Sequence, residues 1–440
     1  MNHDIIKRVI FDQHEVIANA KIVIRDVALE KNANYVLVGL RRAGKSTLLY
    51  KRVQDLIKEG VEWNQIIYIN FDDERLLGFK VSDFEDILLV AEELSSKKHY
   101  FYFDEIQNID GWEKFAIRVA NQHYKVDITG SNAKMLSKEV AAKLGGRYVV
   151  KEVFPYSFAE YLRAHGVDKN GYSSKEIGRL NSLLSSFFVY GGLPESVPFN
   201  NKREYVSGVY QKVLYNDIIV HNGIRNENGI KLMIKKLAES VKQVLSFTKI
   251  QNIISGIGYK LSKDVIIDYC GYCKDAFLLF TLENYYASFL DKASNPKYYF
   301  IDNGILNLFL DDKKSSLFEN LVAIHLHRHY GDDVYYLKSA RCDIDFYISS
   351  TSTAIQAAYS IHESEAYDRE VSNLLEFAKN RKDPTSLIIV TYEEEKTLNI
   401  DGYMIEVLPL KKFLLKIEIW LDLAIQNVDE APNPWIPIWI

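Results

Sequence analysis

With 440 residues, the chain is too long for one ordinary hydrophobic core, so we expect two to four domains. Hydrophobic residues make up 48% and charged residues 26% of the sequence, which excludes an intrinsically disordered chain. The formal net charge of −5 excludes a general attraction to nucleic acid, although one domain can still carry a basic patch.

The three cysteines argue against a disulfide framework and favour a reducing compartment. The first residues carry charges where a signal peptide is apolar, and no run of 18 uncharged apolar residues occurs in the sequence. We therefore expect a cytoplasmic protein that does not span a membrane.

Short apolar runs alternate with helix-like segments over residues 1–155. Four of these runs predict buried strands, at 35–40, 66–71, 99–105 and 125–131. Strands that are apolar throughout and alternate with helices indicate a parallel sheet with helices on both faces. We therefore expect an α/β domain over residues 1–155.

The rest of the chain changes pattern several times. The helical pattern of residues 156–200 predicts a lid or a linker. Over residues 201–292, two short helices precede an apolar hairpin, which indicates a winged-helix-like helical domain. Strand and helix patterns return over 293–425 and predict another α/β unit. The proline-interrupted tail, residues 426–440, cannot be a helix.

The stretch GLRRAGKS, residues 39–46, lies between a predicted buried strand and a predicted helix. Gly39 and Gly44 let the backbone curl so that its N–H groups converge on phosphate oxygens, and the helix adds the positive end of its dipole. Lys45 brings a full charge to the phosphates, and Ser46 brings a hydroxyl to Mg²⁺. The spacing predicts a phosphate-binding loop.

We expect the loop and the first residue after it to contact the nucleotide: Gly39, Leu40, Arg41, Arg42, Ala43, Gly44, Lys45, Ser46 and Thr47. The side chains of Arg41 and Arg42 could turn to the phosphates, but we expect them to face outward.

An acidic pair ends the third predicted strand, YFYFDEI. Asp104 and Glu105 follow the apolar residues directly, and the carboxyl ends of strands in an open α/β sheet lie beside the phosphate-binding loop. We expect Asp104 to hold Mg²⁺ together with Ser46. We expect Glu105 to orient or deprotonate the attacking water.

Three further residues are candidates for sensing the terminal phosphate. Ser131 and Asn132 follow the fourth strand, although a capped turn into the next helix explains either of them equally well. Arg147 follows a glycine pair and could stabilise the charge of the transition state, within the chain or across a subunit boundary. A surface or salt-bridged arginine is the alternative.

Six motifs occur in the order seen in a known family: YVLVGLRRAGKSTLL, IIYINFDDERL, YFDEIQNIDGWEKF, ITGSNAKML, LGGRYV and VFPYSFAEYL. In these motifs the chain resembles AAA+-like P-loop ATPases of bacteria and archaea, whose C-terminal domain ends in a restriction-endonuclease-like unit. The resemblance implies ATP, Mg²⁺ and hydrolysis, with Lys45, Glu105 and Arg147 as catalytic residues. It also implies a P-loop NTPase fold with a central parallel sheet and helical lid. A homo-oligomer fits, since AAA+-type sites often borrow an arginine from a neighbour.

A restriction-endonuclease-like domain over 293–425 would carry one or two acids that hold Mg²⁺ and a lysine that polarises the phosphate. Glu319 from a helix, with Asp343 and Asp345 at strand spacing, fits the acids of such a site. Gln356 stands where the second metal ligand is expected, and Ala358 stands where the pattern has lysine.

With these departures the site has too few charges for phosphodiester cleavage, and we expect a fold that has kept its shape but lost its chemistry. Two alternatives stay open: Lys338 could replace the missing lysine if it points inward, and the region could have a different fold.

The winged-helix-like stretch could bind DNA. Residues 201–292 contain 13 Lys and Arg against 9 Asp and Glu, and Lys231, Lys235 and Lys242 lie at roughly helical spacing. The alternative is an ordinary solvated helix face. Our leading hypothesis is an ATP-hydrolysing switch that engages double-stranded DNA or a protein partner. A DNA-binding or cleaving protein regulated by ATP and a non-catalytic scaffold are the alternatives.

Overall fold

The computed structural model describes residues 1–131, 142–170, 173–311, 314–381 and 385–415. Asn132, most of the helix expected after it and the tail 426–440 therefore lie outside the described residues. The chain forms two compact units that interleave along the sequence. The first comprises Met1–Glu239, Phe247–Phe280 and Phe300–Leu310, and the second comprises Ser240–Ser246, Thr281–Tyr299 and Asp311–Ile440. The domain boundaries predicted from the sequence stay predictions, since one compact unit can hold several domains.

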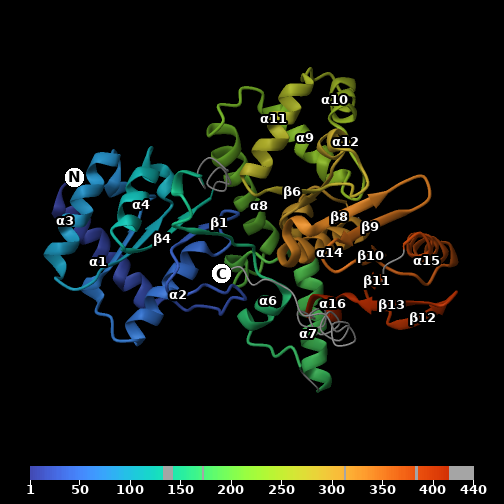
Figure 1. Cartoon of the computed structure of the whole chain (residues 1–440), viewed down its shortest axis with the longest axis horizontal. Coiled ribbons are helices and arrows are strands. Elements are labelled where there is room, and N and C mark those ends of the chain that lie inside the picture. The colour runs from blue at the N-terminus through green and yellow to red at the C-terminus, as the bar shows by residue number, and fades with distance from the viewer. Residues whose placement is uncertain (132–141, 171–172, 312–313, 382–384, 416–440) are drawn as a thin grey trace, which may run out of the picture. The chain divides into compact units, whose positions relative to one another are not determined.

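The first part of the first unit alternates helices and strands, as its apolar runs predict (Figure 1). Its strands form one parallel sheet in the order β2-β3-β4-β1-β5. The elements are α1 (His3–Asn19), β1 (Tyr35–Val38), α2 (Lys45–Lys58), β2 (Ile66–Asn70), α3 (Phe84–Leu94), β3 (Tyr100–Asp104), α4 (Trp112–Asn121), β4 (Lys125–Gly130) and β5 (Val149–Glu152).

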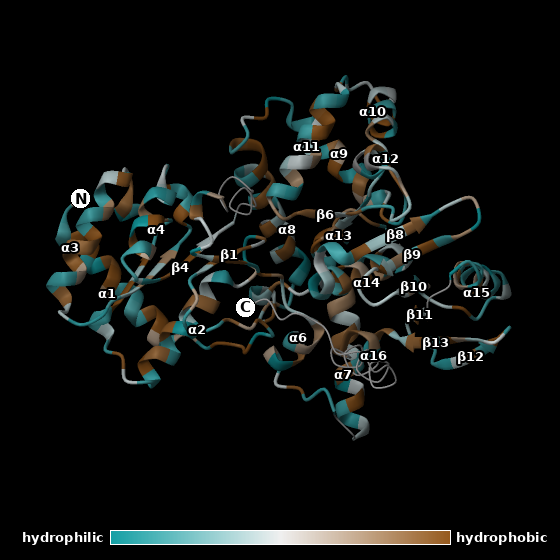
Figure 2. Cartoon of the chain, viewed as in Figure 1, coloured by the Kyte–Doolittle hydropathy of each residue, from teal (hydrophilic) through white to brown (hydrophobic). Residues whose placement is uncertain are grey.

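The central strands are buried on both faces, but β4 is not apolar throughout as expected, since Lys125, Asp127 and Thr129 alternate with apolar residues. Asp127 is compensated by ion pairs with Lys125 and Arg52. All four residues of β1 and all six residues of β4 are buried, because helices cover the sheet and leave neither face to solvent. Figure 2 shows hydrophilic and hydrophobic residues together on α1 and α2, as expected of helices that pack one face on a sheet. The predicted α/β domain with a parallel sheet is confirmed.

The sheet order brings the carboxyl ends of three strands together. Strand β1 lies between β4 and β5, and Val38 pairs with Gly130 on one side. Strand β3 is the other neighbour of β4, with Phe103 opposite Ile128. The carboxyl ends of the strands therefore bring together the loop after β1, the acids at the end of β3 and the polar residues after β4.

Three elements of this part were not predicted from the sequence: α1, α3 and β5. Helix α1 precedes the first expected strand and buries Ile6, Val9, Ile10 and Ile17 along one face. Strand β5 lies at the edge of the sheet, and none of its residues is fully buried. Its short sequence, VVKE, gives almost no strand signal, and pairing with β1 alone establishes it.

The rest of the first unit is helical apart from the strand residues near 280 and 300. Its helices are α6 (Phe158–Ala164), α7 (Ser174–Tyr190), α8 (Lys202–Lys212), the π-helix η7 (Val213–Val220), α9 (Glu227–Glu239), α10 (Phe247–Gly256), α11 (Lys263–Asp275) and α13 (Asn303–Leu306). Two short strands, β6 (Leu279–Leu282) and β7 (Lys297–Phe300), pair in a separate sheet. Only β6 lies within the range 201–292 where a hairpin is expected, and its partner β7 lies beyond it, so the winged-helix description stays a prediction.

The second unit contains a six-stranded mixed sheet in the order β12-β13-β11-β10-β9-β8. Strand β10 is parallel to β11 and antiparallel to β9. The elements are α12 (Phe289–Ser294), α14 (Lys314–Tyr330), β8 (Val334–Lys338), β9 (Asp343–Ile348), β10 (Thr353–Ala357), α15 (Ser364–Lys379), β11 (Ser386–Thr391), β12 (Lys396–Ile400), β13 (Tyr403–Pro409) and α16 (Leu410–Leu415). The expected second α/β unit is confirmed, with β12 and β13 as strands that the sequence analysis missed.

Candidate functional site

The loop after β1 needs its glycines for steric reasons. Gly39 has φ +143°, and a Cβ there would lie 2.2 Å from the carbonyl oxygen of Val153. Gly44 has φ +97° and stands directly before the first residue of α2. Side chains at either position would strain or obstruct the loop. Its backbone therefore curls between strand and helix as a phosphate-binding loop does.

Lys45 begins α2 with its side chain folded over the loop. The side chain is buried, and Nζ donates to the carbonyl oxygens of Gly39 at 3.0 Å and Leu40 at 3.1 Å. Burial lowers the pKa of Lys45, while Glu105 and Asp104 oppose that shift. The ammonium group thus lies inside the loop, where the phosphates of a nucleotide would replace these two carbonyl contacts.

Arg25, which the sequence analysis missed, supports the loop from the segment before β1. Its Nη1 donates to the carbonyl oxygen of Ala43 at 3.0 Å, and Nη2 donates to that of Phe154 at 2.7 Å. Its Nε lies 3.0 Å from a carboxylate oxygen of Glu160, and both side chains are almost fully buried. Arg25 therefore holds the loop against the entry to α6.

Asp104, the last residue of β3, lies among three hydroxyl groups. The Tyr68 hydroxyl donates to Oδ2 at 2.9 Å, Thr129 donates to Oδ1, and Ser46 also hydrogen-bonds to the carboxyl group. Burial raises the pKa of Asp104, Glu105 raises it further, and the three hydroxyl groups oppose the shift. A buried carboxylate beside a serine hydroxyl supplies the hard oxygen ligands that Mg²⁺ prefers.

Glu105 has a left-handed backbone, with φ +52°, and its N–H donates to Thr129 Oγ1 at 3.1 Å. Its Oε2 accepts from Gln107 Nε2 at 2.5 Å and from Ser131 Oγ at 3.1 Å. Burial would raise the pKa of Glu105, but Lys45, Gln107 and nearby groups together lower it. Glu105 is therefore an ionised carboxylate in a fixed orientation, as a residue that orients water requires.

Ser131, expected as a phosphate sensor, follows the carboxyl end of β4 and donates a hydrogen bond to Glu105 in this structure. Asn132, the other candidate, lies outside the described residues. Thr129, Tyr68 and Gln107 are contacts that the sequence analysis missed. Only the register of β2, β3 and β4 brings their side chains together.

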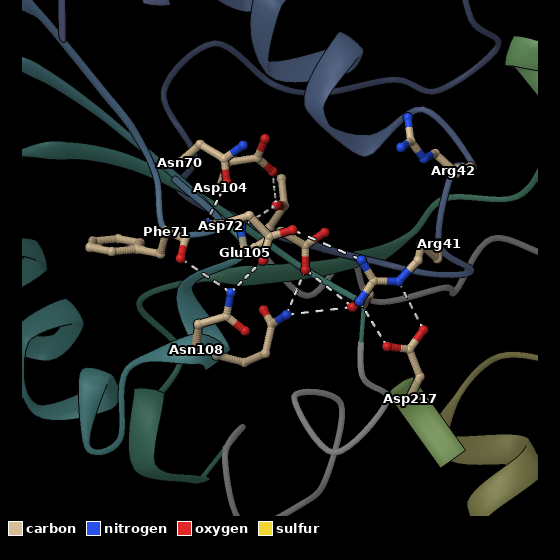
Figure 3. A network of polar contacts seen from close by, with 12 residues as sticks. Arg41, Arg42, Asn70, Phe71, Asp72, Asp104, Glu105, Asn108 and Asp217 are labelled. Atoms are coloured by element: carbon tan, nitrogen blue, oxygen red, sulfur yellow. Dashed lines mark hydrogen bonds and ion pairs between the residues drawn. The ribbon is translucent and has the colours of Figure 1, made fainter. Parts of the chain in front are cut away.

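The two loop arginines turn away from the loop interior and form ion pairs. Arg41 forms a bidentate pair with Asp217 of η7, with Nε···Oδ2 3.0 Å and Nη2···Oδ1 2.8 Å (Figure 3). Arg42 binds both carboxylate oxygens of Glu195, at 2.9 and 2.8 Å. The expectation that both side chains face outward agrees with this geometry, and their acidic partners were not foreseen.

A cavity of about 880 Å³ adjoins the loop. Near Gly44 its walls include Ile24, Thr47, Tyr156 and Pro194. Most of the remaining lining is polar or charged and includes Tyr100 and Lys125 at the amino ends of β3 and β4, so only the end at Gly44 adjoins the loop. The nucleoside of a nucleotide whose phosphates bind the loop would occupy the end of the cavity near Gly44. The sequence analysis named Thr47 and missed the other three residues near Gly44, which come from separate segments.

Comparison with known proteins agrees with this geometry. Residues 31–162 match the family model of an AAA domain, and residues 181–316 match a domain of unknown function. An uncharacterised protein of Methanocaldococcus jannaschii is 32% identical over 93% of this chain and 95% of its own length. An uncharacterised protein of Haemophilus influenzae is 32% identical over 87% and 94%. The chain belongs to the same family as these two proteins, and its first domain has the P-loop NTPase fold.

A solved Walker-type ATPase of Pyrococcus abyssi is also similar, at 14% identity and a TM-score of 0.38, covering 69% of this chain and 94% of its own. Among the described residues, no helix combines the length and apolarity needed to cross a membrane.

Arg147 lies away from the phosphate-binding loop of its own chain. The register pairs Val149 with Tyr35, so Arg147 precedes β5 at the amino end of the strands, whereas the loop follows their carboxyl ends. Its side chain is exposed, and Nε donates to Asn121 Oδ1 at 2.5 Å. In this structure Arg147 does not approach its own loop, and both a role across a subunit boundary and an ordinary surface role stay predictions.

The nuclease-like residues of the second unit lie around a lysine that the sequence analysis missed. Lys297 of β7 is buried, with Nζ 3.3 Å from Asp345 Oδ1 and 3.6 Å from Glu319 Oε1. Glu319 also accepts from the Tyr299 hydroxyl at 2.9 Å. The ammonium group therefore occupies the space between the two acids. Within the described parts of the chain, no group of three or more His, Cys, Asp and Glu residues could hold a metal ion.

Gln356 and Asp343 do not join this cluster as metal ligands. Gln356 Oε1 accepts from the Asp345 N–H at 2.9 Å, and its Nε2 donates to the Asp343 carbonyl oxygen at 2.9 Å. Its side chain thus braces β9 against β10. The Asp343 carboxylate is half-exposed and pairs with Lys338 at 2.7 Å, so Lys338 does not replace the missing lysine.

The row of lysines predicted for DNA contact does not form one face. Lys231 and Lys235 belong to α9, but Lys242 follows the end of that helix with φ +86°. Lys242 Nζ donates to Ser315 Oγ at 2.6 Å, and Lys231 Nζ donates to the Tyr215 hydroxyl at 2.7 Å. The prediction of a single basic stripe is wrong, because the helix ends before the third lysine.

Proposed function

We propose that this protein binds ATP with Mg²⁺ and hydrolyses it, and that its other domains convert the nucleotide state into contact with a partner. One observation carries the proposal: Lys45, Ser46, Asp104 and Glu105 converge at one edge of the parallel sheet. A cation, a hydroxyl group and two acids are the set that phosphoryl transfer to water requires.

The proposed nucleotide lies with its phosphates on the loop amides and the N-terminus of α2. Lys45 then exchanges its contacts with the carbonyl oxygens of Gly39 and Leu40 for phosphate oxygens. The nucleoside occupies the cavity beside Gly44, between Ile24 and Pro194. The family model and the geometry support a phosphate site, and ATP as the nucleotide belongs to the proposal.

Ser46 and Asp104 are the residues that would hold Mg²⁺, which neutralises the phosphate charge when bound. Glu105 then accepts the proton of a water molecule or orients it toward the terminal phosphate. Ser131 and Gln107 fix the direction of the Glu105 carboxylate, and Lys45 keeps it ionised by lowering its pKa. Each part of the proposed reaction thus rests on a side chain with a fixed partner.

Calorimetry and phosphate release test the proposal together. Lys45→Ala should bind ATP at least a hundredfold more weakly, because the loop loses its positive charge. Glu105→Gln should bind ATP normally and hydrolyse it about a hundredfold to a thousandfold more slowly, because the water loses its base. Lys97→Ala, at an exposed position outside the site, is the control. Wild-type turnover in either of the first two variants would contradict the proposal.

We propose double-stranded DNA or a protein as the partner, with DNA cleavage as the less favoured function. The observation against cleavage is the use of Gln356 as a brace, with Lys297 between the acids. Such a unit serves as a binding scaffold that retains a nuclease-like shape. ATP turnover should rise when the correct partner is added, and DNA should stay intact with Mg²⁺. Cleavage that disappears in Asp345→Ala would favour the nuclease alternative.

A further inference from the structure

Arg41 connects the phosphate-binding loop to a helix far along the chain. Its guanidinium group makes two parallel hydrogen bonds to Asp217, at 176 positions' separation. Only 16% of the Arg41 side chain and 13% of the Asp217 side chain are exposed. A bidentate, largely desolvated pair of this kind is stronger than a surface ion pair. The pair therefore has the strength to fix the position of the helix relative to the loop.

The surroundings of Arg41 are rich in acids. Asp72 lies 3.9 Å from Nη1, and Glu105 also attracts the guanidinium group. Figure 3 shows Arg41 between the acids at the end of the sheet and Asp217, whereas Arg42 points away from them. A triphosphate that enters this site meets several carboxylates and needs every available cation. Of the two arginines within the loop, Arg41 is the one attracted by Glu105 and Asp72.

Asp217 belongs to the π-helix η7, which continues directly from α8. The π-helix is rare in proteins. Where it occurs, it is often part of a functional site. The ion pair to the loop thus holds a segment whose backbone hydrogen bonding is uncommon.

We propose that Arg41 is a second phosphate-binding cation of the nucleotide site, and that ATP takes it from Asp217 and thereby releases η7. The inference rests on the proposed function. Arg41 stands two residues after Gly39, and its side chain borders a cavity of about 410 Å³ on the side of α8, so it is not packed on all sides. Phosphate offers the same bidentate geometry as the carboxylate. Because Arg41 would contact the terminal phosphate, ADP should release η7 less than ATP.

Affinities for ATP and ADP with Mg²⁺, measured by calorimetry on the full chain, test the inference. Arg41→Gln should weaken ATP binding about tenfold to a hundredfold and ADP binding less than threefold, because one charge-assisted phosphate contact is lost. Asp217→Asn should strengthen ATP binding about threefold to tenfold, because Arg41 no longer has to leave a charged partner. In the double variant Arg41→Gln with Asp217→Asn, this gain in ATP affinity should disappear. Arg118→Gln and Glu85→Gln, an exposed pair outside the site, are the matched controls.

Two outcomes would overturn the inference while leaving the proposed function intact. One is an unchanged ratio of ATP to ADP affinity in Arg41→Gln. The other is full recovery of ATP binding in the charge-swapped double variant Arg41→Asp with Asp217→Arg, which would show that the pair is structural only. If the unaltered chain binds neither nucleotide, the proposed function fails and the inference fails with it.

Hydrogen exchange gives a second readout that a purely structural arginine would not change. With a slowly hydrolysed ATP analogue, the amides of residues 213–220 should exchange about threefold or more faster than with ADP. In Asp217→Asn the exchange should be fast in both states. Equal exchange with both nucleotides in the unaltered chain would contradict the release of η7.

Discussion

The buried Glu319 shows how one residue can make the stability of the protein depend on pH. Burial and the nearby Asp345 raise the pKa of Glu319 to about 7, against the effect of Lys297. A carboxyl group with a raised pKa binds its proton more tightly in the folded protein than in the unfolded chain. Its contribution to stability is therefore complete below the ordinary pKa of 4.5 and is lost as the pH rises through about 7.

Glu319→Gln, which has the same shape and no charge, should remove this dependence. Between pH 5 and pH 8, the unfolding free energy of the unaltered protein should fall by roughly 2–3 kcal/mol relative to the variant. Denaturant unfolding at a series of pH values measures the difference, and Glu62→Gln at an exposed position is the control. Parallel curves for the unaltered protein and Glu319→Gln would show that the carboxyl group is ionised throughout.

At the scale of elements, the helices α6 and α7 begin with the same capping box in different environments. In α6, Ser157 and Glu160 cap each other's backbone N–H groups, and Glu160 also accepts from the Asp26 N–H at 2.7 Å and pairs with Arg25. In α7, Ser173 and Glu176 form the same box at an exposed site. The buried box therefore joins a helix start to the segment that supports the phosphate-binding loop.

Replacement of the two glutamates by alanine should separate these roles. Glu160→Ala should destabilise the protein by about 3–5 kcal/mol, because Arg25 stays buried without its carboxylate. Glu176→Ala should cost only about 1 kcal/mol, the ordinary value of a lost cap. Thermal unfolding measures both, and ATP affinity should fall only in Glu160→Ala, since Arg25 contacts Ala43 of the loop. Equal costs in the two variants would contradict a supporting role for Glu160.

At the scale of the whole molecule, we propose that Arg147 completes the nucleotide site of a neighbouring copy, since it lies away from its own loop. Arg147 lies at the amino ends of the strands, whereas Lys45 lies at their carboxyl ends. It can therefore reach a nucleotide only in a neighbouring copy. An arginine supplied across a subunit boundary typically speeds hydrolysis by about 10³–10⁵. The proposed ATPase should therefore work as an assembly of several copies.

Mixing two inactive variants tests this assembly. Arg147→Ala should lose about 99.9% of turnover, the lower limit for loss of an arginine supplied by a neighbour. Lys45→Ala should lose as much, because it no longer binds ATP. A mixture should regain activity, because some interfaces then join an intact loop to an intact arginine. Phosphate release and mass in solution with nucleotide are the measurements. Near-normal turnover of Arg147→Ala alone would contradict a role for this residue.

The ATPase core could be predicted well from the sequence because its signals are local. The glycines of the loop, Lys45 and the acidic pair Asp104 and Glu105 follow apolar strands directly, so a few consecutive residues reveal each of them. A parallel sheet then aligns the ends of its strands by necessity. The nuclease-like site was predicted less well. Gln356 has the expected spacing, but its side-chain amide hydrogen-bonds to the backbone of β9.

The sequence by itself determined where the candidate phosphate and metal residues lie, because backbone curvature and strand ends depend on residues that are neighbours in the chain. Only the tertiary structure decided which distant side chains complete or restrain these positions. Lys297 lies 48 positions from Asp345, and Arg41 lies 176 positions from Asp217. Pairing between such residues depends on how helices and strands pack, and no periodicity or spacing in the sequence encodes it.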